Sequence, residues 1–332
     1  MRNSLIWIEP NGGWTSNKDE DGIEYNDTGL CNRVLHWEIA YKINEKAGFN
    51  YNIVVEEEFW PEYDLITLPN TLALNQESIS TESIPLSFEK ATSILRSDDF
   101  NLDLTKNYRS DFGYKTLVSF YDELYFFHPL AHIELKSNFI KDYLKKVTKD
   151  VVGIHIRRNS GVSYKEEDLS YLTPGLKEEY IKFRSNSAQV KGLSYIKDEV
   201  YFNVIDNILK INPSQKFYLS CDLPYELFSY YKDRYGFSIV TKEDIMPEIL
   251  KVEKESKTLN NLVDLFALSY CKFLIKSNNS SWSDFAQFYK NQPATYVKDH
   301  FERVIKPKYM NSSWDQEGHY GLEKIKVKRN LF

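Results

Sequence analysis

The chain has 332 residues and a formal net charge of −6, and 42% of its residues are hydrophobic. The negative charge argues against a nucleic-acid-binding protein that depends on bulk positive charge, and the hydrophobic content argues against a disordered chain. No segment approaches the roughly 20 apolar residues of a membrane helix, and the three cysteines are too far apart for a metal site or a disulfide framework. We therefore expect a cytoplasmic protein, large enough for two domains, with no nucleic-acid partner and no transmembrane segment.

The first half of the chain begins with a predicted strand at Ser4–Glu9, which a polar loop connects to a helix ending near Lys46. Gly48 is well placed to cap this helix, and the next strand is predicted at Asn52–Glu57. A strand, a helix and a second strand in this order are typical of the start of an α/β domain. Between residues 61 and 117 no periodicity predicts particular elements.

Strands and helices alternate regularly in the second half of the chain. After a charged helix at 136–149, strands are predicted at 151–156, 216–220, 237–240, 273–275 and 294–297, and helices at 194–209, 224–235, 259–270 and 281–289. This alternation predicts a parallel, doubly wound sheet. We expect a first domain of residues 1–148 and a second of residues 149–332, whose basic tail from Val304 to Phe332 either packs back on the first domain or frays.

The strand at 151–156 carries His155 near its end and is followed by two arginines. Its run of Val and Ile predicts a strand that is buried on both faces. Ligands of open α/β sheets bind at the carboxyl ends of the strands, so Arg157 and Arg158 are expected where a ligand would bind. Two guanidinium groups that stay charged form an anion site suited to a diphosphate.

Two further predicted strands also end in polar turns. Asp222 lies in a sharp turn before a helix, and the turn at 278–281 offers backbone N–H groups and hydroxyls at a helix N-terminus. Such an N-terminus is a favourable place for a phosphate. Simple capping of the helix by Ser280 or Ser281 is the alternative function of this turn.

Asp264 lies in an apolar stretch of a predicted helix, between Val263 and Leu265. A carboxylate in such surroundings needs a partner. Two partners are possible: the N1–H and N2–H groups of a guanine base, or an internal Arg or Lys.

Together these motifs resemble the GDP-fucose-dependent fucosyltransferases, which include the core and Nod-factor enzymes and are distantly related to the protein O-fucosyltransferases. The His-x-Arg-Arg sequence at residues 155–158 is similar to the Arg-Arg signature of this family. The other similar segments are Thr28–Arg33, Ser220–Pro224, Leu262–Ser269 and Asn278–Ser281. The resemblance covers most of residues 150–290 and a short stretch near the N-terminus.

The resemblance implies two Rossmann-like domains facing a cleft, the GT-B architecture, with the acceptor on the side of the first domain and the nucleotide sugar bound mostly by the second. It implies a metal-independent, inverting glycosyltransferase that transfers fucose from GDP-fucose to a hydroxyl of a glycan or glycoconjugate. No cofactor is expected besides this donor substrate. In agreement, no Asp-x-Asp motif that could carry Mg²⁺ sits at a predicted strand end.

The resemblance also implies roles for individual residues. Arg157 is expected to stabilise the β-phosphate of the leaving diphosphate, Arg158 to orient it or contact the acceptor, and His155 to bond the ribose or a phosphate. The other residues expected to bind the donor are Gly29, Cys31, Asn32, Asp222, Asp264, Asn279, Ser280 and Ser281.

A general base would deprotonate the acceptor hydroxyl. Glu166, in an acidic loop that follows the arginine pair, is the candidate, and Glu9, Glu38, Glu56 and His128 are alternatives from the first domain. A transition state that depends mainly on departure of the leaving group would need no strong base.

One position departs from the family pattern. The family often has Arg-Arg-x-Asp, whereas this chain has Ser160 in place of the Asp. Two alternatives therefore stay open: a transferase that uses another nucleotide sugar or an activated sulfate, and a non-catalytic saccharide- or nucleotide-binding protein on the same fold.

Overall fold

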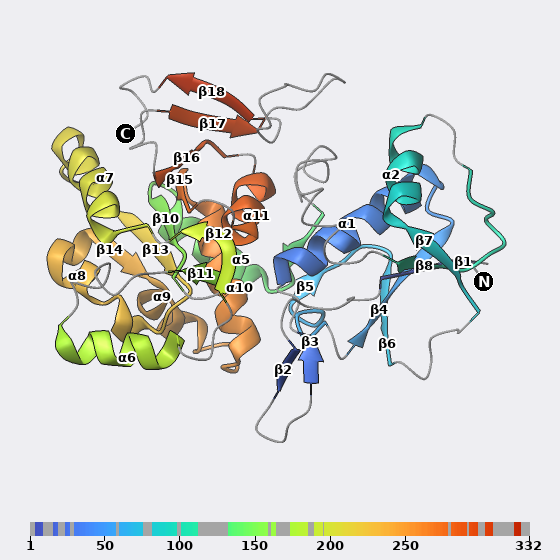
Figure 1. Ribbon diagram of the computed structural model, residues 1–332, viewed down its shortest axis with the longest axis horizontal. Helices are drawn as coiled ribbons and strands as arrows, with labels where there is room; N and C mark the ends of the chain where they lie inside the picture. Colours follow the sequence, from blue (N-terminus) through green and yellow to red (C-terminus); the bar gives the residue numbers. More distant parts are fainter. Residues whose placement is uncertain are drawn as a thin grey trace. The chain divides into compact units, whose positions relative to one another are not determined.

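The computed structural model divides the chain into two compact units (Figure 1). The first lies within residues 1–136, and the second contains residues 137–308 together with a strand at 322–326. The structure describes residues 4–8, 16–18, 24–26, 30–57, 60–75, 82–97, 101–111, 132–158, 161–163, 173–184, 189–194, 196–277, 280–290, 292–297, 303–307 and 322–326. Within these ranges, no helix combines the length and the apolar character needed to cross a membrane.

A five-stranded parallel sheet forms the first unit. In spatial order its strands are β6 (Thr71–Leu74), β4 (Tyr51–Glu56), β1 (Ser4–Ile8), β8 (Tyr108–Asp111) and β7 (Ile84–Ser87). Helix α1 (Leu30–Lys46) packs on β1, β4 and helix α2 (Phe88–Arg96). Two short antiparallel pairs complete the unit: β2 (Ser16–Lys18) with β3 (Glu24–Asn26), and β5 (Ile66–Thr67) with β9 (Glu134–Leu135).

The turn between α1 and β4 confirms the predicted helix cap. Gly48 has a φ of +64°, a left-handed conformation that glycine adopts without strain. The side chain of Asn44 bonds both the N–H and the carbonyl of Tyr51, each at 2.9 Å. These bonds attach the end of the helix to the start of β4.

A seven-stranded sheet forms the second unit. In spatial order its strands are β14 (Ile239–Thr241), β13 (Phe217–Cys221), β10 (Val152–Ile156), β15 (Phe273–Lys276), β16 (Ala294–Tyr296), β17 (Arg303–Pro307) and β18 (Leu322–Lys326). The strands β14 to β16 of this series are parallel, and β17 and β18 extend the sheet as an antiparallel pair at one edge (Figure 1).

The order of the five parallel strands is that of the Rossmann fold. Counted along the chain from β10, the order is 3-2-1-4-5. After β10, the next two parallel strands, β13 and β14, lie on one side of it, and the following two, β15 and β16, lie on the other side. The carboxyl end of β10 is therefore the switch point at which sheets of this type bind ligands.

Helices pack on both faces of this sheet, and the described part of the unit contains seven α-helices in all. They are α5 (Asn138–Thr148), α6 (Pro174–Arg184), α7 (Asp198–Ile211), α8 (Tyr230–Tyr235), α9 (Lys242–Ile249), α10 (Lys257–Tyr270) and α11 (Ser281–Lys290). Alternate residues of β10, namely Val152, Ile154 and Ile156, form a core with α7 and α8. Gly153 points to the opposite face, where an added Cβ would lie 2.8 Å from Leu268 of α10.

The α/β class and the parallel second sheet confirm the prediction from the sequence. The predicted helix at 224–235 is instead a 3-10 turn, η4 (Tyr225–Leu227), followed by the short helix α8, and helix α9 was not predicted. The units divide between residues 136 and 137, before helix α5, because α5 packs against α10. The predicted boundary lay after this helix, and the expected cleft between the domains stays a prediction.

Candidate functional site

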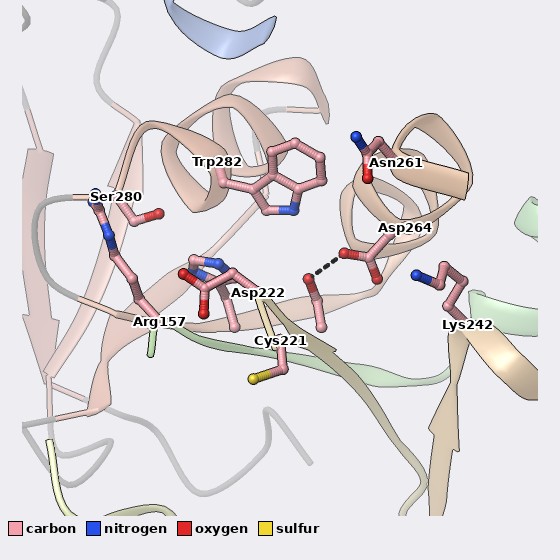
Figure 2. A pocket seen from close by; sticks show the side chains of 10 residues that line it. Arg157, Cys221, Asp222, Lys242, Asn261, Asp264, Ser280 and Trp282 are labelled. Atoms are coloured by element: carbon pink, nitrogen blue, oxygen red, sulfur yellow. Dashed lines mark hydrogen bonds between the residues drawn. The ribbon is translucent and has the colours of Figure 1, made fainter. Parts of the chain in front are cut away.

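A pocket of about 300 Å³ lies at the carboxyl ends of β10 and β13, at the switch point of the second sheet. Its lining residues are His155, Arg157, Ser220, Cys221, Asp222, Lys242, Asn261, Asp264, Ser280 and Trp282. Figure 2 shows Arg157 and Ser280 on one side of the pocket. Asn261, Asp264 and Lys242, which lie on helices, are on the opposite side. The volume is at the lower end of the range for pockets that bind small molecules.

Arg157 follows directly after β10, and its backbone is held by a serine of the neighbouring strand. Its N–H donates to Oγ of Ser277 at 3.1 Å, and the same hydroxyl donates to the carbonyl of His155 at 2.7 Å. The paired residues of β10 and β15 end at Ile154 and Ile275. Beyond the last paired residues, the Ser277 hydroxyl therefore replaces the backbone hydrogen bonds between the strands and holds the backbone of Arg157 beside the pocket.

Arg158 lies in a different environment from the one expected. Its side chain is 1% exposed, and its guanidinium bonds Asp198 at 3.0 Å and lies 5.3 Å from the ring centroid of Tyr201. The hydroxyl of Tyr231 also donates to Asp198. Because this guanidinium is enclosed and does not line the pocket, the expected pair of arginines is reduced to Arg157.

Asp222 fulfils its expected placement at the end of β13. It lines the pocket, and its Oδ1 accepts the backbone N–H of Arg158 at 2.6 Å. The backbone on either side of Arg157 is therefore held from two neighbouring strands, by Ser277 after β15 and by Asp222 after β13.

His155 lines the pocket as a neutral imidazole. Burial, together with the nearby charges of Arg157 and Lys276, lowers the pKa of His155 to about 3. Its Nδ1 is buried and has no hydrogen-bond partner among the described residues. A neutral imidazole donates through one ring nitrogen and accepts through the other.

Asp264 projects from α10 into the pocket (Figure 2). Its Oδ1 accepts the hydroxyl of Tyr218 and its Oδ2 accepts the hydroxyl of Ser220, both at 2.7 Å. Burial raises the pKa of Asp264 to about 6, so the carboxylate is mostly ionised at pH 7. Among the described residues no Arg or Lys lies within ion-pair distance of Asp264, and its direct partners are the two hydroxyls. The nearby charge of Lys242 still lowers the pKa of Asp264, so the internal cation considered from the sequence acts on the carboxylate without bonding it. Because an ionised carboxylate has about four acceptor sites, about two stay available for a ligand.

Ser280 lies where α11 begins and is 3% exposed. Its carbonyl accepts the hydroxyl of Ser283 at 3.2 Å and the N–H of Asp284 at 3.0 Å, which forms the first turn of the helix. The N-terminus of α11 therefore starts at the pocket, next to Arg157 in Figure 2. Helix N-termini attract anions through their unpaired N–H groups.

Five pocket residues were not predicted as site residues. Ser220 and Cys221 lie in a segment that resembles the family, and the other three come from helices. Asn261 precedes Asp264 by one helical turn and therefore shares its face of α10. Trp282 follows the predicted polar turn by one residue, so both could have been found from their spacing. Lys242 begins α9, a helix that the sequence did not predict, and no local signal placed it here.

Several predicted site residues belong to parts of the chain without a described placement. Gly29, Glu166 and Asn279 lie outside the described residues, as do Glu9 and His128. Asn32 and Ser281 are placed only as members of helices α1 and α11. Cys31, Glu38 and Glu56 are buried side chains of the first unit.

Positive charge in the pocket comes from Arg157 and Lys242. Among the residues that the structure describes, no group of three His, Cys, Asp or Glu side chains is arranged to hold a metal ion. The pocket thus presents two cations, two carboxylates and an aromatic ring to a ligand.

No family model matches the sequence, and no curated protein matches it. Solved structures similar to this chain include the fucosyltransferase NodZ from Bradyrhizobium (12% identity, 98% of each chain covered, TM-score 0.42). A mutant of Arabidopsis thaliana FUT1 in complex with GDP is 11% identical over 88% of this chain and 69% of its own (TM-score 0.42). POFUT1 in complex with GDP is 8% identical over 89% and 98% (TM-score 0.44). At these identities and TM-scores the similarity assigns no role to individual residues.

Proposed function

We propose that this chain is an inverting, metal-independent glycosyltransferase that binds GDP-fucose in the pocket at the end of β10 and transfers fucose to a hydroxyl of a glycan or glycoconjugate. The observation that carries the proposal is the placement of Asp264 and Arg157 on opposite sides of one pocket at a Rossmann switch point. A carboxylate suits a guanine base, and a guanidinium suits a diphosphate. The resemblance of the sequence motifs to GDP-fucose-dependent enzymes supports the same ligand.

The side of the pocket around Asp264 suits a guanine base. Tyr218 and Ser220 each donate to one of its oxygens, which holds the carboxylate in a fixed orientation. The acceptor sites that stay available match the parallel N1–H and N2–H donors of guanine, a pair that adenine and uracil do not present. Trp282, which lies between the two sides of the pocket in Figure 2, supplies an aromatic face for a base or a sugar.

The side around Arg157 suits the diphosphate. The guanidinium stays charged, and the N-terminus of α11 adds partial positive charge at Ser280. During transfer the bond between the sugar C1 and the β-phosphate oxygen breaks while the acceptor oxygen bonds C1 from the opposite face. Negative charge grows on the departing GDP, and Arg157 stabilises it without a metal.

The acceptor hydroxyl loses its proton as the new bond forms. We propose Glu166 for this role because it follows the arginine pair in an acidic loop. Replacement of Glu166 by Gln should lower kcat strongly and leave GDP affinity unchanged if it is the base.

A thermal-shift panel with GDP, GDP-fucose, UDP and ADP tests the proposed donor. GDP and GDP-fucose at about 100 times Kd should raise the Tm by roughly 5 °C. Arg157→Ala should strongly reduce the shift and abolish turnover, because it removes the diphosphate contact and leaves only the contacts of the base. Arg234→Ala is the matched control, since Arg234 lies on α8 and is half exposed outside the pocket.

The panel also separates the alternatives. Equal shifts with UDP or ADP would point to another nucleotide sugar or an activated sulfate. A shift with GDP-fucose but no GDP release in the presence of a panel of oligosaccharide acceptors would point to a non-catalytic binding protein. The absence of any nucleotide shift would contradict the donor site as a whole.

A further inference from the structure

A buried network connects helix α7 to the backbone that carries Arg157. Two residues of α7, Asp198 and Tyr201, lie three positions apart and hence on one face of the helix. Both contact the side chain of Arg158: Asp198 through an ion pair at 3.0 Å and Tyr201 through its ring. All three side chains are almost completely buried, with exposures of 0–1%.

The network continues from Tyr201 to Ser277. The two hydroxyl oxygens are 3.0 Å apart. Because a serine hydroxyl has one hydrogen, and Ser277 donates it to the carbonyl of His155, Tyr201 must be the donor of the bond between them. Ser277 then accepts a second hydrogen bond from the N–H of Arg157 at 3.1 Å. Its hydroxyl is fully used: it donates once and accepts twice.

The contacts of this network all restrain the chain at Arg157 and Arg158. Ser277 holds the backbone of Arg157 from the side of β15, and the guanidinium of Arg158 is held by Asp198 and Tyr201. The backbone N–H of Arg158 is held by Asp222 from the side of β13. Hydrogen bonds and an ion pair therefore fix the backbone of Arg157 and both the backbone and the side chain of Arg158. None of Ser277, Tyr201 and Asp198 is among the residues that line the pocket.

We propose that Ser277 and Tyr201, supported by the Arg158–Asp198 ion pair, are positioning residues that hold Arg157 in the orientation required to bind a diphosphate. This inference rests on the proposed function, because it assigns Arg157 to the phosphates of a nucleotide. It makes Arg158 part of the support of the site, where the sequence suggested a second phosphate ligand. A preorganised contact of this kind depends on the residues that fix it as well as on the group that touches the ligand.

The test compares GDP with guanosine, which has the same base and no phosphate. Ser277→Ala should weaken GDP binding about tenfold, the magnitude of one misplaced charged hydrogen bond, and change guanosine binding less than about twofold. In an Arg157→Ala background, Ser277→Ala should cause no further loss of GDP affinity, because the group that it positions is absent. Titration calorimetry or a competition assay measures each dissociation constant.

Ser269→Ala is the matched control. Ser269 is as completely buried as Ser277, and its hydroxyl also donates to a backbone carbonyl at 2.7 Å, that of Leu265 within α10, but it does not line the pocket or contact the network. It should lower the Tm without changing the ratio of GDP to guanosine affinity. If Ser277→Ala does not fold, Tyr201→Phe removes one hydroxyl and keeps the ring, and it should weaken GDP binding about threefold with guanosine unaffected.

The outcomes distinguish the two proposals. Equal losses for GDP and guanosine, or no loss for either, would overturn the positioning role and leave the proposed donor intact. An additional loss in the Arg157→Ala background would also overturn it. Failure of the wild-type protein to bind GDP would overturn the proposed function, and the inference with it.

Discussion

Asp264 and Arg158 show how the surroundings of a side chain decide its function. Both residues carry charged side chains with partners inside the protein. Asp264 accepts two hydroxyls and still has acceptor sites that face the pocket, whereas the guanidinium of Arg158 is enclosed by Asp198 and Tyr201. The sequence predicts both residues near the ligand. Only the contacts show that Asp264 is available to a ligand and that Arg158 supports its neighbour.

The pKa of Asp264 predicts a pH dependence of nucleotide binding. Burial raises this pKa to about 6, so the carboxylate becomes protonated, and loses acceptor capacity for guanine N–H groups, as the pH falls through 6. At pH 8 Asp264→Asn should bind GDP roughly 10- to 100-fold more weakly than wild type. The ratio of the GDP affinities of wild type and Asp264→Asn should decrease towards pH 5. Titration of the GDP phosphates is common to both proteins, so a difference that stays constant from pH 5 to 8 would contradict this role.

Glu38 predicts a pH dependence of stability in the first unit. Burial raises the pKa of Glu38 from 4.5 to about 8, and both carboxyl oxygens lack a hydrogen-bond partner among the described residues. Above pH 4.5 the unfolded chain releases this proton while the folded chain retains it, so stability falls as the pH rises towards 8 and levels off above it. Glu38→Gln should remove this penalty.

Urea unfolding at several pH values measures the effect. The gain in the free energy of unfolding of Glu38→Gln over wild type should grow by at most about 1.4 kcal/mol per pH unit between pH 5 and 8. A gain that does not depend on pH would show that Glu38 ionises normally in the folded protein.

At the scale of elements, the strands and helices that place the pocket were largely predictable. Val151–Ile156 was predicted as a buried strand, and β10 spans Val152–Ile156, because a strand covered on both faces needs an uninterrupted apolar run. Helix α9 escaped prediction because it is short, with 8 residues, and contains Pro247, although its capping box of Thr241 and Asp244 was a usable signal.

Tertiary contacts explain what the sequence did not reveal about the site. Asp198, the partner of Arg158, is 40 positions away along the chain, at the start of a helix without local signs of a role in ligand binding. Lys242 reaches the pocket only because α9 begins beside β14. Asn261 was recoverable, since residues one helical turn apart share a face.

The close approach of β10 and α10 depends on Gly153. An alanine Cβ at this position would lie 2.6 Å from Cδ2 of Leu274 and 2.8 Å from Cδ1 of Leu268. Gly153→Ala should lower the free energy of unfolding by about 1–3 kcal/mol, the usual cost of overpacking a core. Gly175→Ala, in helix α6 with no atom within 4 Å of the added Cβ, is the control and should be neutral or stabilising by up to about 1 kcal/mol. Equal effects of the two substitutions would contradict close packing at Gly153.

At the scale of the whole molecule, the chain combines two α/β units. The sheet of the first is parallel, and that of the second has five parallel strands and an antiparallel pair at one edge. Every lining residue that the structure describes for the pocket belongs to the second unit. A nucleotide should therefore bind mainly to this unit, as the sequence resemblance implied. That the first unit recognises the acceptor stays a proposal.

A crystal structure of the protein with GDP would show where the base and the phosphates bind. We predict that the N1–H and N2–H groups of guanine lie within hydrogen-bond distance of the Asp264 carboxylate and that the β-phosphate contacts the guanidinium of Arg157. A pocket that stays empty at saturating GDP, or a nucleotide whose phosphates lie at Asp264, would show that GDP does not bind in this way.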